Sequence, residues 1–89
     1  MFYMANIQVA YNWAIEVCNE PNVGYSQQYR NQRTVNGITY YDCSSFIWYA
    51  LLAGGWDLET KYGTWPFTTS TMANILLQEG FTRYDPSVP

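Results

Sequence analysis

The segment Cys43–Ala53 constrains the fold more than any other part of the chain. It reads Cys-Ser-Ser-Phe-Ile-Trp-Tyr-Ala-Leu-Leu-Ala, is apolar at nearly every position after Ser45, and is followed directly by Gly54-Gly55. A helix that is apolar almost all round has to be covered on most of its sides, and glycine commonly ends helices. The sequence therefore predicts a buried central helix that stops at Gly54.

The chain is short for covering such a helix. Its 89 residues form at most one small domain, although 48% apolar and 19% aromatic residues indicate a packed unit rather than a disordered one. A net charge of −3 argues against a nucleic-acid partner, because phosphates attract basic surfaces. No apolar run approaches the roughly 20 residues that span a bilayer, so we expect no membrane partner. The first residues lack the positive flank and the cleavage site of a signal peptide.

A first helix is predicted between Asn6 and Asn19. Its apolar residues recur at steps of three and four, at Ile7, Ala10, Tyr11, Ala14, Val17 and Cys18. This spacing is typical of an amphipathic helix, with Asn6 as its N-cap and Pro21 beyond its end. Because Cys18 falls on the apolar stripe, we interpret it as an inert core thiol.

The two cysteines do not suggest a metal site. Cys18 and Cys43 lie 25 positions apart in a sequence without histidine, which matches no zinc-binding spacing. In the absence of a secretion signal we do not expect them to form a disulfide. We predict no metal and no cofactor.

The remaining segments predict an α+β chain. Residues 20–42 are irregular and polar, and Asn36-Gly37 between two β-prone runs indicates a tight hairpin. A polar connection runs from Gly55 through Pro66. A third helix is expected from Ser70 or Thr71 to about Glu79, with Met72, Ile75 and Leu76 inward and Gly80 as its stop, and then a strand over Phe81–Asp85.

Cys43 is the strongest candidate for chemistry. It stands at the first turn of the central helix, where unpaired N–H groups and the helix dipole favour a thiolate, the reactive form of cysteine. The same N–H groups are suited to binding the oxyanion of a tetrahedral intermediate. Asp42 or Ser44 is the expected cap of this helix, and the charge of Asp42 opposes thiolate formation.

Several motifs together resemble the bacteriophage peptidoglycan hydrolases of the amidase-5 family, which belong to the papain-like, NlpC-type cell-wall hydrolases. They are Tyr25-Ser26 with Arg30 five residues after the tyrosine, the run Tyr41-Asp42-Cys43-Ser44-Ser45, and the helix-and-strand segment Thr71–Phe81. The resemblance covers nearly the whole chain. It implies the N-terminal helical half of a papain-like fold, with three helices, a short hairpin and the start of an antiparallel sheet.

The resemblance also assigns roles residue by residue. Cys43 matches the catalytic nucleophile, and Tyr25 matches a tyrosine that lines the site near the oxyanion. Ser26 and Asp42 match residues that border the cleft, and Ser44 and Ser45 match the small polar pair behind the nucleophile. Arg30 matches a loop arginine that either contacts a carboxylate of the stem peptide or, as we slightly prefer, braces the loop.

Two departures from the family pattern limit what this chain can do. The loop Asn31–Tyr40 is somewhat longer than in relatives. The family's general base is a histidine on a later strand, and this sequence has none. We therefore expect residues 1–89 to be the N-terminal part of one catalytic domain, inactive alone.

The expected partner is bacterial peptidoglycan, and either the chain's own C-terminal half or a second copy would cover its exposed apolar faces. The protein would be made in the host cytoplasm and act at the cell wall. The intact enzyme would cleave the bond between muramic acid and L-alanine, or one within the stem peptide. A non-catalytic fragment that binds or regulates at the wall, and a small interaction domain with Cys43 in its core, are the alternatives.

Overall fold

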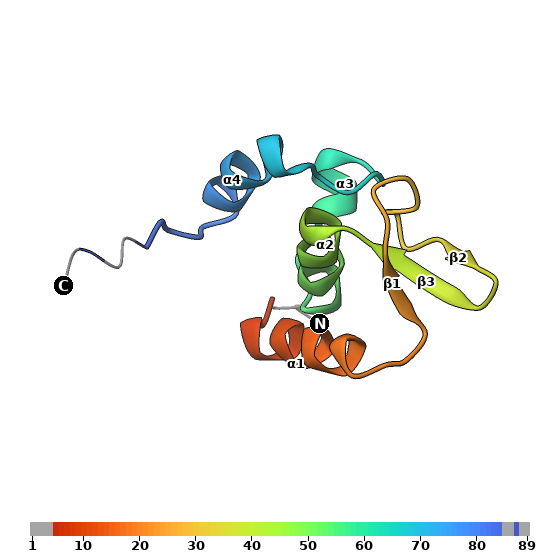
Figure 1. Cartoon of the computed structure of the whole chain (residues 1–89). Coiled ribbons are helices and arrows are strands. Elements are labelled where there is room, and N and C mark those ends of the chain that lie inside the picture. Colours follow the sequence, from red (N-terminus) through yellow and green to blue (C-terminus); the bar gives the residue numbers. More distant parts are fainter. Residues whose placement is uncertain (1–4, 85–86, 88–89) are drawn as a thin grey trace.

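The central helix forms as its sequence predicts, and the rest of the chain is arranged around it (Figure 1). The computed structural model describes residues 5–84 and 87. They form four helices, α1 (Ile7–Cys18), α2 (Cys43–Ala53), α3 (Leu58–Tyr62) and α4 (Thr69–Gln78), and three strands, β1 (Val23–Tyr25), β2 (Thr34–Val35) and β3 (Ile38–Tyr41). The predicted α+β class is confirmed.

Helix α2 carries the core of the molecule. Trp48 and Leu51 are buried and cluster with Leu58 of α3 and with Phe67. The rings of Trp48 and Phe67 meet edge to face with centroids 5.0 Å apart. Trp48 and Leu51 lie three positions apart and face the core from the same side of α2, whereas Ile47 is exposed, so the described structure does not cover this apolar helix on every side.

Helix α1 crosses the end of α2 at close range. The side chain of Asn6 caps α1, as predicted, by accepting from the N–H groups of Gln8 and Val9. The N–H of Asn6 donates to the carbonyl of Gly54 at 2.7 Å. A Cβ at Gly54 would lie 2.8 Å from the Cβ of Ala10, so this crossing requires glycine at the end of α2.

The predicted buried stripe of α1 is only partly correct. Ala10 and Val17 are buried, whereas Ile7, Tyr11 and Cys18 are exposed. The interpretation of Cys18 as a core thiol is therefore wrong. One residue after the buried Val17, its side chain is turned by about 100° around the helix and leaves the face that packs on α2.

The predicted hairpin is confirmed. Strands β2 and β3 pair antiparallel with Val35 opposite Ile38, and Asn36 and Gly37 have φ values of 52° and 79°. Positive φ at both turn residues is the type I′ geometry that Asn-Gly favours. The sequence did not reveal β1, which pairs in parallel with β3 in the order β1-β3-β2.

The C-terminal part differs from the prediction in two places. Part of the expected polar connection is the short helix α3, whose Leu58 is fully buried. The predicted strand Phe81–Asp85 is wrong over Phe81–Tyr84, which are not in a strand, and Asp85 lies outside the described residues. The reason is local: the N–H of Phe81 donates to the carbonyl of Leu76 at the end of α4, and its ring packs against Trp56.

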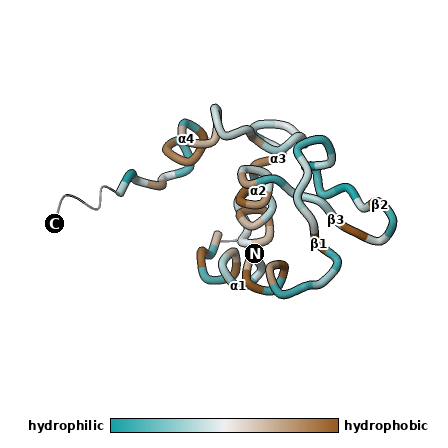
Figure 2. Tube along the Cα trace, in the orientation of Figure 1, coloured by the Kyte–Doolittle hydropathy of each residue, from teal (hydrophilic) through white to brown (hydrophobic). Residues whose placement is uncertain are grey.

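Helix α4 begins at Thr69, one residue before the predicted start, with Thr68 as its N-cap. Met72, Ile75 and Leu76 are half-buried against the core, as predicted. Apolar segments of α1, α2 and α4 are visible in Figure 2. A groove of about 220 Å³ between α1 and α2 is lined by Ile7, Ala10, Tyr11, Ala14, Phe46, Ile47, Ala50 and Leu51. Over the described part of the chain, no helix has the length and apolar character needed to cross a membrane.

Candidate active site at the start of helix α2

The thiol of Cys43 is exposed at the first residue of α2. Strand β3 ends at Tyr41, so Asp42 alone connects the sheet to the helix. The Asp42 carboxylate accepts from the N–H of Ser45 at 2.8 Å, and the N–H of Asp42 donates to Oγ of Ser45 at 2.8 Å. This reciprocal capping box fixes the direction in which the chain enters α2, and with it the position of Cys43.

The capping box leaves donors free at the thiol. The N–H of Phe46 donates to the carbonyl of Asp42, and the N–H of Ser45 is bound by the carboxylate. The first N–H groups of a helix have no partner within it. Among the described residues at the start of α2, the N–H groups of Cys43 and Ser44 are thus the ones without a hydrogen-bond partner.

Arg30 holds the N-terminal cap of α2 in place through hydrogen bonds. Its guanidinium is buried and donates from Nε to the Asp42 carboxylate at 2.8 Å and from a terminal nitrogen to Oγ of Ser44 at 3.1 Å. It also donates to the backbone carbonyls of Pro66, at 2.8 Å, and of Phe67. One side chain therefore joins the loop before the hairpin, the start of α2 and the segment that leads into α4.

These bonds determine the charge state of the cap. Partial burial raises the pKa of Asp42, but hydrogen bonds from Arg30 and Ser45 and the positive charge of Arg30 outweigh burial and bring the pKa below its usual value. The carboxylate is therefore ionised at neutral pH and engaged with Arg30.

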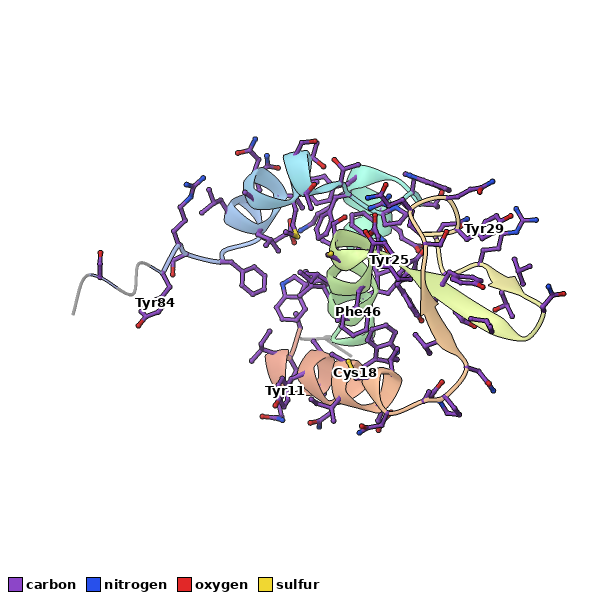
Figure 3. The ribbon with its side chains drawn as sticks, in the orientation of Figure 1. Tyr11, Cys18, Tyr25, Tyr29, Phe46 and Tyr84 are labelled. Carbon is purple, nitrogen blue, oxygen red and sulfur yellow. The ribbon has the colours of Figure 1, made fainter. Side chains whose placement is uncertain are left out.

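Cys43 lies between two pockets. The first, of about 270 Å³, is mostly apolar and is lined by Val17, Cys18, Val23, Gly24, Tyr25, Tyr41, Asp42, Cys43 and Phe46. The second, of about 160 Å³, is lined by Tyr25, Gln27, Asp42, Cys43, Ser44, Thr68 and Thr69. Tyr25, Asp42 and Cys43 belong to both linings. Figure 3 labels three residues that line the first pocket, Tyr25 of β1, Phe46 of α2 and Cys18 of α1.

An aromatic cluster around Tyr41 lies beside the first pocket, which Tyr41 and Phe46 line. Tyr41 is buried, and its ring lies within 6 Å, centroid to centroid, of those of Trp13, Phe46 and Tyr49. Its hydroxyl accepts from Nε2 of Gln32 at 2.9 Å. Burial raises the pKa of the Tyr41 phenol, so the group stays neutral and adds no charge to the pocket.

The predicted site residues separate into two groups. Tyr25, Asp42, Cys43 and Ser44 meet around the pockets, whereas Ser26 and Arg30 line neither. Oγ of Ser26 instead accepts from the N–H groups of Gln28 and Tyr29 and shapes the turn after β1. The buried Ser45 completes the capping box.

Sequence reasoning missed several lining residues. Gln27, Thr68 and Thr69 join the polar pocket, and Val17, Cys18 and Phe46 join the apolar one. No local pattern marks them, because α1, the loop and the start of α4 meet only in the folded chain. Nowhere in the described structure do three or more His, Cys, Asp or Glu side chains form a group that could hold a metal.

One of three comparisons with known proteins found a match. Residues 6–86 match the family model described as bacteriophage peptidoglycan hydrolase, the amidase-5 family. No curated protein matches the chain, and no solved structure matches it. The matched range covers all of the described helices and strands and both pockets at Cys43. The chain therefore belongs to the bacteriophage peptidoglycan hydrolase family, whose members hydrolyse the polymer of the bacterial cell wall.

Proposed function

We propose that the chain supplies the nucleophile half of a cysteine hydrolase that cleaves an amide bond of peptidoglycan. The observation that carries the proposal is the exposed thiol of Cys43 at the start of α2, between two pockets and beside two free N–H groups. The bond is the one between muramic acid and L-alanine or one within the stem peptide. Membership of a peptidoglycan hydrolase family supports the substrate class.

The proposed reaction has two steps. The Cys43 thiolate attacks the amide carbonyl, and the N–H groups of Cys43 and Ser44 donate to the resulting oxyanion. The tetrahedral intermediate collapses to a thioester as the C–N bond breaks and the amine leaves with a proton. Water then attacks the thioester, which yields a carboxylate and returns the thiol.

The neighbouring residues have different roles in this proposal. Tyr25 lines both pockets and contacts substrate beside the oxyanion. Asp42 and Arg30 are positioning residues, because they bond to each other while Asp42 caps α2 at the N–H of Ser45 and Arg30 binds the carbonyl of Pro66. We infer that Arg30 braces the site rather than binding a stem-peptide carboxylate, since four hydrogen bonds already occupy its buried guanidinium.

The reaction also needs a general base. A histidine normally accepts the thiol proton and returns a proton to the leaving amine, and the sequence has no histidine. We propose that residues 1–89 act with a histidine-bearing segment, and that they hydrolyse little or nothing alone. A histidine-bearing C-terminal half that covers the groove between α1 and α2 would also bury apolar surface, whereas a second copy there would bury that surface but supply no histidine.

The experiment is wall lysis with and without that segment. The chain fused to the histidine-bearing part of an amidase-5 relative is expected to clear a suspension of purified walls, and the chain alone is not. Cys43→Ala in the fusion should abolish clearing, whereas Arg33→Ala, at an exposed side chain that lines neither pocket, should leave it largely intact. A Cys43→Ala fusion that still lyses walls contradicts the nucleophile assignment.

The same samples test the non-catalytic alternative. If no fusion cleaves walls, and the chain alone is retained on them equally with Cys43 or alanine, the protein is a wall-binding fragment. The exposed Tyr25 and Trp65 are among the side chains available for such binding, at 63% and 56% exposure.

A further inference from the structure

Strand β1 is an edge strand, and its backbone direction is fixed by its bonds to β3. It pairs with β3 on one side only. The N–H of Thr39 donates to the carbonyl of Asn22 at 2.9 Å, and the N–H of Ser26 donates to the carbonyl of Tyr41 at 2.9 Å. The carbonyl of Asn22 and the N–H of Ser26, which flank β1 on either side, therefore point toward β3.

The residues between them follow by alternation. Successive residues of a strand direct their backbone groups to opposite edges, so position 24 also faces β3 and positions 23 and 25 face away. Val23 and Tyr25 thus present their N–H and C=O groups at the free edge, where no described residue binds them. An edge of this kind is a template for an added strand.

This free edge borders the nucleophile. Val23, Gly24 and Tyr25 all line the pocket of about 270 Å³ that Cys43 also lines. Figure 1 shows β1 on the side of the sheet that faces α1 and α2, with β2 on the far side. A second chain that paired with β1 along its free edge would run through this pocket and past the thiol.

The pocket has no free charge with which to select its occupant. Asp42 is its one charged residue, and that carboxylate is bound by Arg30. The other lining side chains are aliphatic, aromatic or thiol groups. Recognition there depends on backbone hydrogen bonds and on small apolar side chains, and these are features of a peptide rather than of a sugar.

We propose that the free edge of β1 binds the peptide part of peptidoglycan as an added strand, which brings a peptide carbonyl to Cys43. The N–H and C=O groups of Val23 and Tyr25 pair with the peptide backbone, and a small apolar side chain such as alanine enters the pocket. The choice of occupant rests on the proposed function, but the edge and its pairing do not.

Amide hydrogen exchange of the 89-residue chain tests the proposal directly. The probe is a synthetic stem tetrapeptide that begins with L-alanine, added at millimolar concentration and followed by NMR. The Val23 and Tyr25 amides are expected to exchange at least severalfold more slowly with peptide, because only they gain an acceptor. The Gly24 and Ser26 amides already bond to β3 and should change little. The wall disaccharide without peptide should protect none of them.

Substitutions at the edge give a second readout. Val23→Pro removes one outward N–H, and proline is tolerated where an edge-strand N–H faces solvent. It is expected to weaken peptide binding about threefold to tenfold relative to Val23→Ala, which loses the side chain but keeps the N–H. Thr34→Pro is the control on the opposite edge of the sheet. There the carbonyl of Arg33 points toward β3, so the backbone groups of Thr34 point away from β3. Thr34→Pro should leave peptide binding unchanged.

The outcomes separate this inference from the proposed function. The added strand is overturned if the peptide changes the NMR chemical shift of the Cys43 amide without slowing hydrogen exchange at Val23 and Tyr25. It is also overturned if the peptide changes the chemical shift of no amide at all. If Val23→Pro does not fold, the exchange measurement on the unmodified chain still decides. Protection of both amides in a chain whose Cys43→Ala fusion still lyses walls would uphold the peptide site and overturn the nucleophile.

Discussion

Arg30 and Asp42 form a buried ion pair directly behind the nucleophile, with Nε 2.8 Å from a carboxylate oxygen. The side chains are 8% and 14% exposed, so solvent screens the pair only weakly. Asp42 uses its other oxygen to cap α2 at Ser45. The pair therefore joins the loop before the hairpin to the helix that carries Cys43, and several predictions depend on this link.

Replacing Arg30 should destabilise the fold strongly. Arg30→Ala leaves the Asp42 carboxylate and two carbonyls without their donor, and a broken buried pair costs about 3–5 kcal/mol. Arg30→Lys should cost less, because an ammonium retains the charge but cannot reach every partner. The measurement is the free energy of unfolding in urea. Arg33→Ala is the control: this side chain is exposed and contacts the Tyr29 ring, so its loss should cost about 1 kcal/mol or less.

The cap and the charge of Asp42 should be separable. Asp42→Asn keeps an acceptor for the N–H of Ser45 and loses only the ion pair, whereas Asp42→Ala loses both. We expect Asp42→Ala to be the more destabilising by about 1 kcal/mol, the usual contribution of an N-cap. Asp57→Ala at the start of α3, where the side chain makes no capping bond, should have a much smaller effect. Equal unfolding midpoints for the two Asp42 variants would argue against the capping role.

Acid should remove the contribution of Asp42. Burial raises its pKa, but bonds from Arg30 and Ser45 dominate, so the folded-state pKa lies below the unfolded one. The stabilisation is therefore fully present above the unfolded pKa of about 3.9 and is lost as pH falls through the folded pKa. The unfolding free energies of the unmodified chain and Asp42→Asn should differ at pH 7 and converge at low pH.

The comparison with Asp42→Asn is needed because another carboxylate also lowers the free energy of unfolding when it is protonated in acid. Hydrogen bonds from Lys61 and Tyr62 lower the pKa of Glu79. Both proteins retain Glu79, so its effect cancels in the difference. A difference that stays constant from pH 7 to pH 2 would contradict the assignment to Asp42.

The hairpin turn should need glycine at position 37 for its backbone conformation and not for lack of space. Gly37 has φ of 79°, and no atom lies within 4 Å of a Cβ built there. Gly37→Ala is thus expected to cost about 1 kcal/mol, from backbone strain without a steric clash. Alkylation of Cys43 should proceed at an unchanged rate, because the turn is remote from the pockets. A large loss of Cys43 reactivity would show that the hairpin and the site are coupled.

Both thiols should react in the folded state, since Cys18 and Cys43 are exposed. Iodoacetamide under native conditions should add two groups, as measured by intact mass, and one group to Cys43→Ser or to Cys18→Ser. If Cys18 reacted only after denaturation, it would be a core thiol after all, and its place in the pocket would be wrong.

Local patterns predicted the elements whose causes lie within a few residues of sequence. The apolar run of α2, the Asn6 cap of α1 and the Asn36-Gly37 turn each depend on neighbours in the chain, and each is confirmed. Strand β1 was missed because three residues carry little periodic signal and pair in parallel with a strand more than a dozen positions away. The strand predicted after Gly80 was wrong because Phe81 packs against Trp56 instead.

The sequence by itself determined the family and the residue that stands at the head of the central helix, because both depend on motifs that adjacent residues carry. Only the tertiary structure decided what surrounds Cys43. It gave Arg30 its position behind the cap, directed Cys18 into a pocket, and placed the free edge of β1 beside the thiol. These relations join segments up to 37 positions apart, and the long-range packing that holds them together has no local signature.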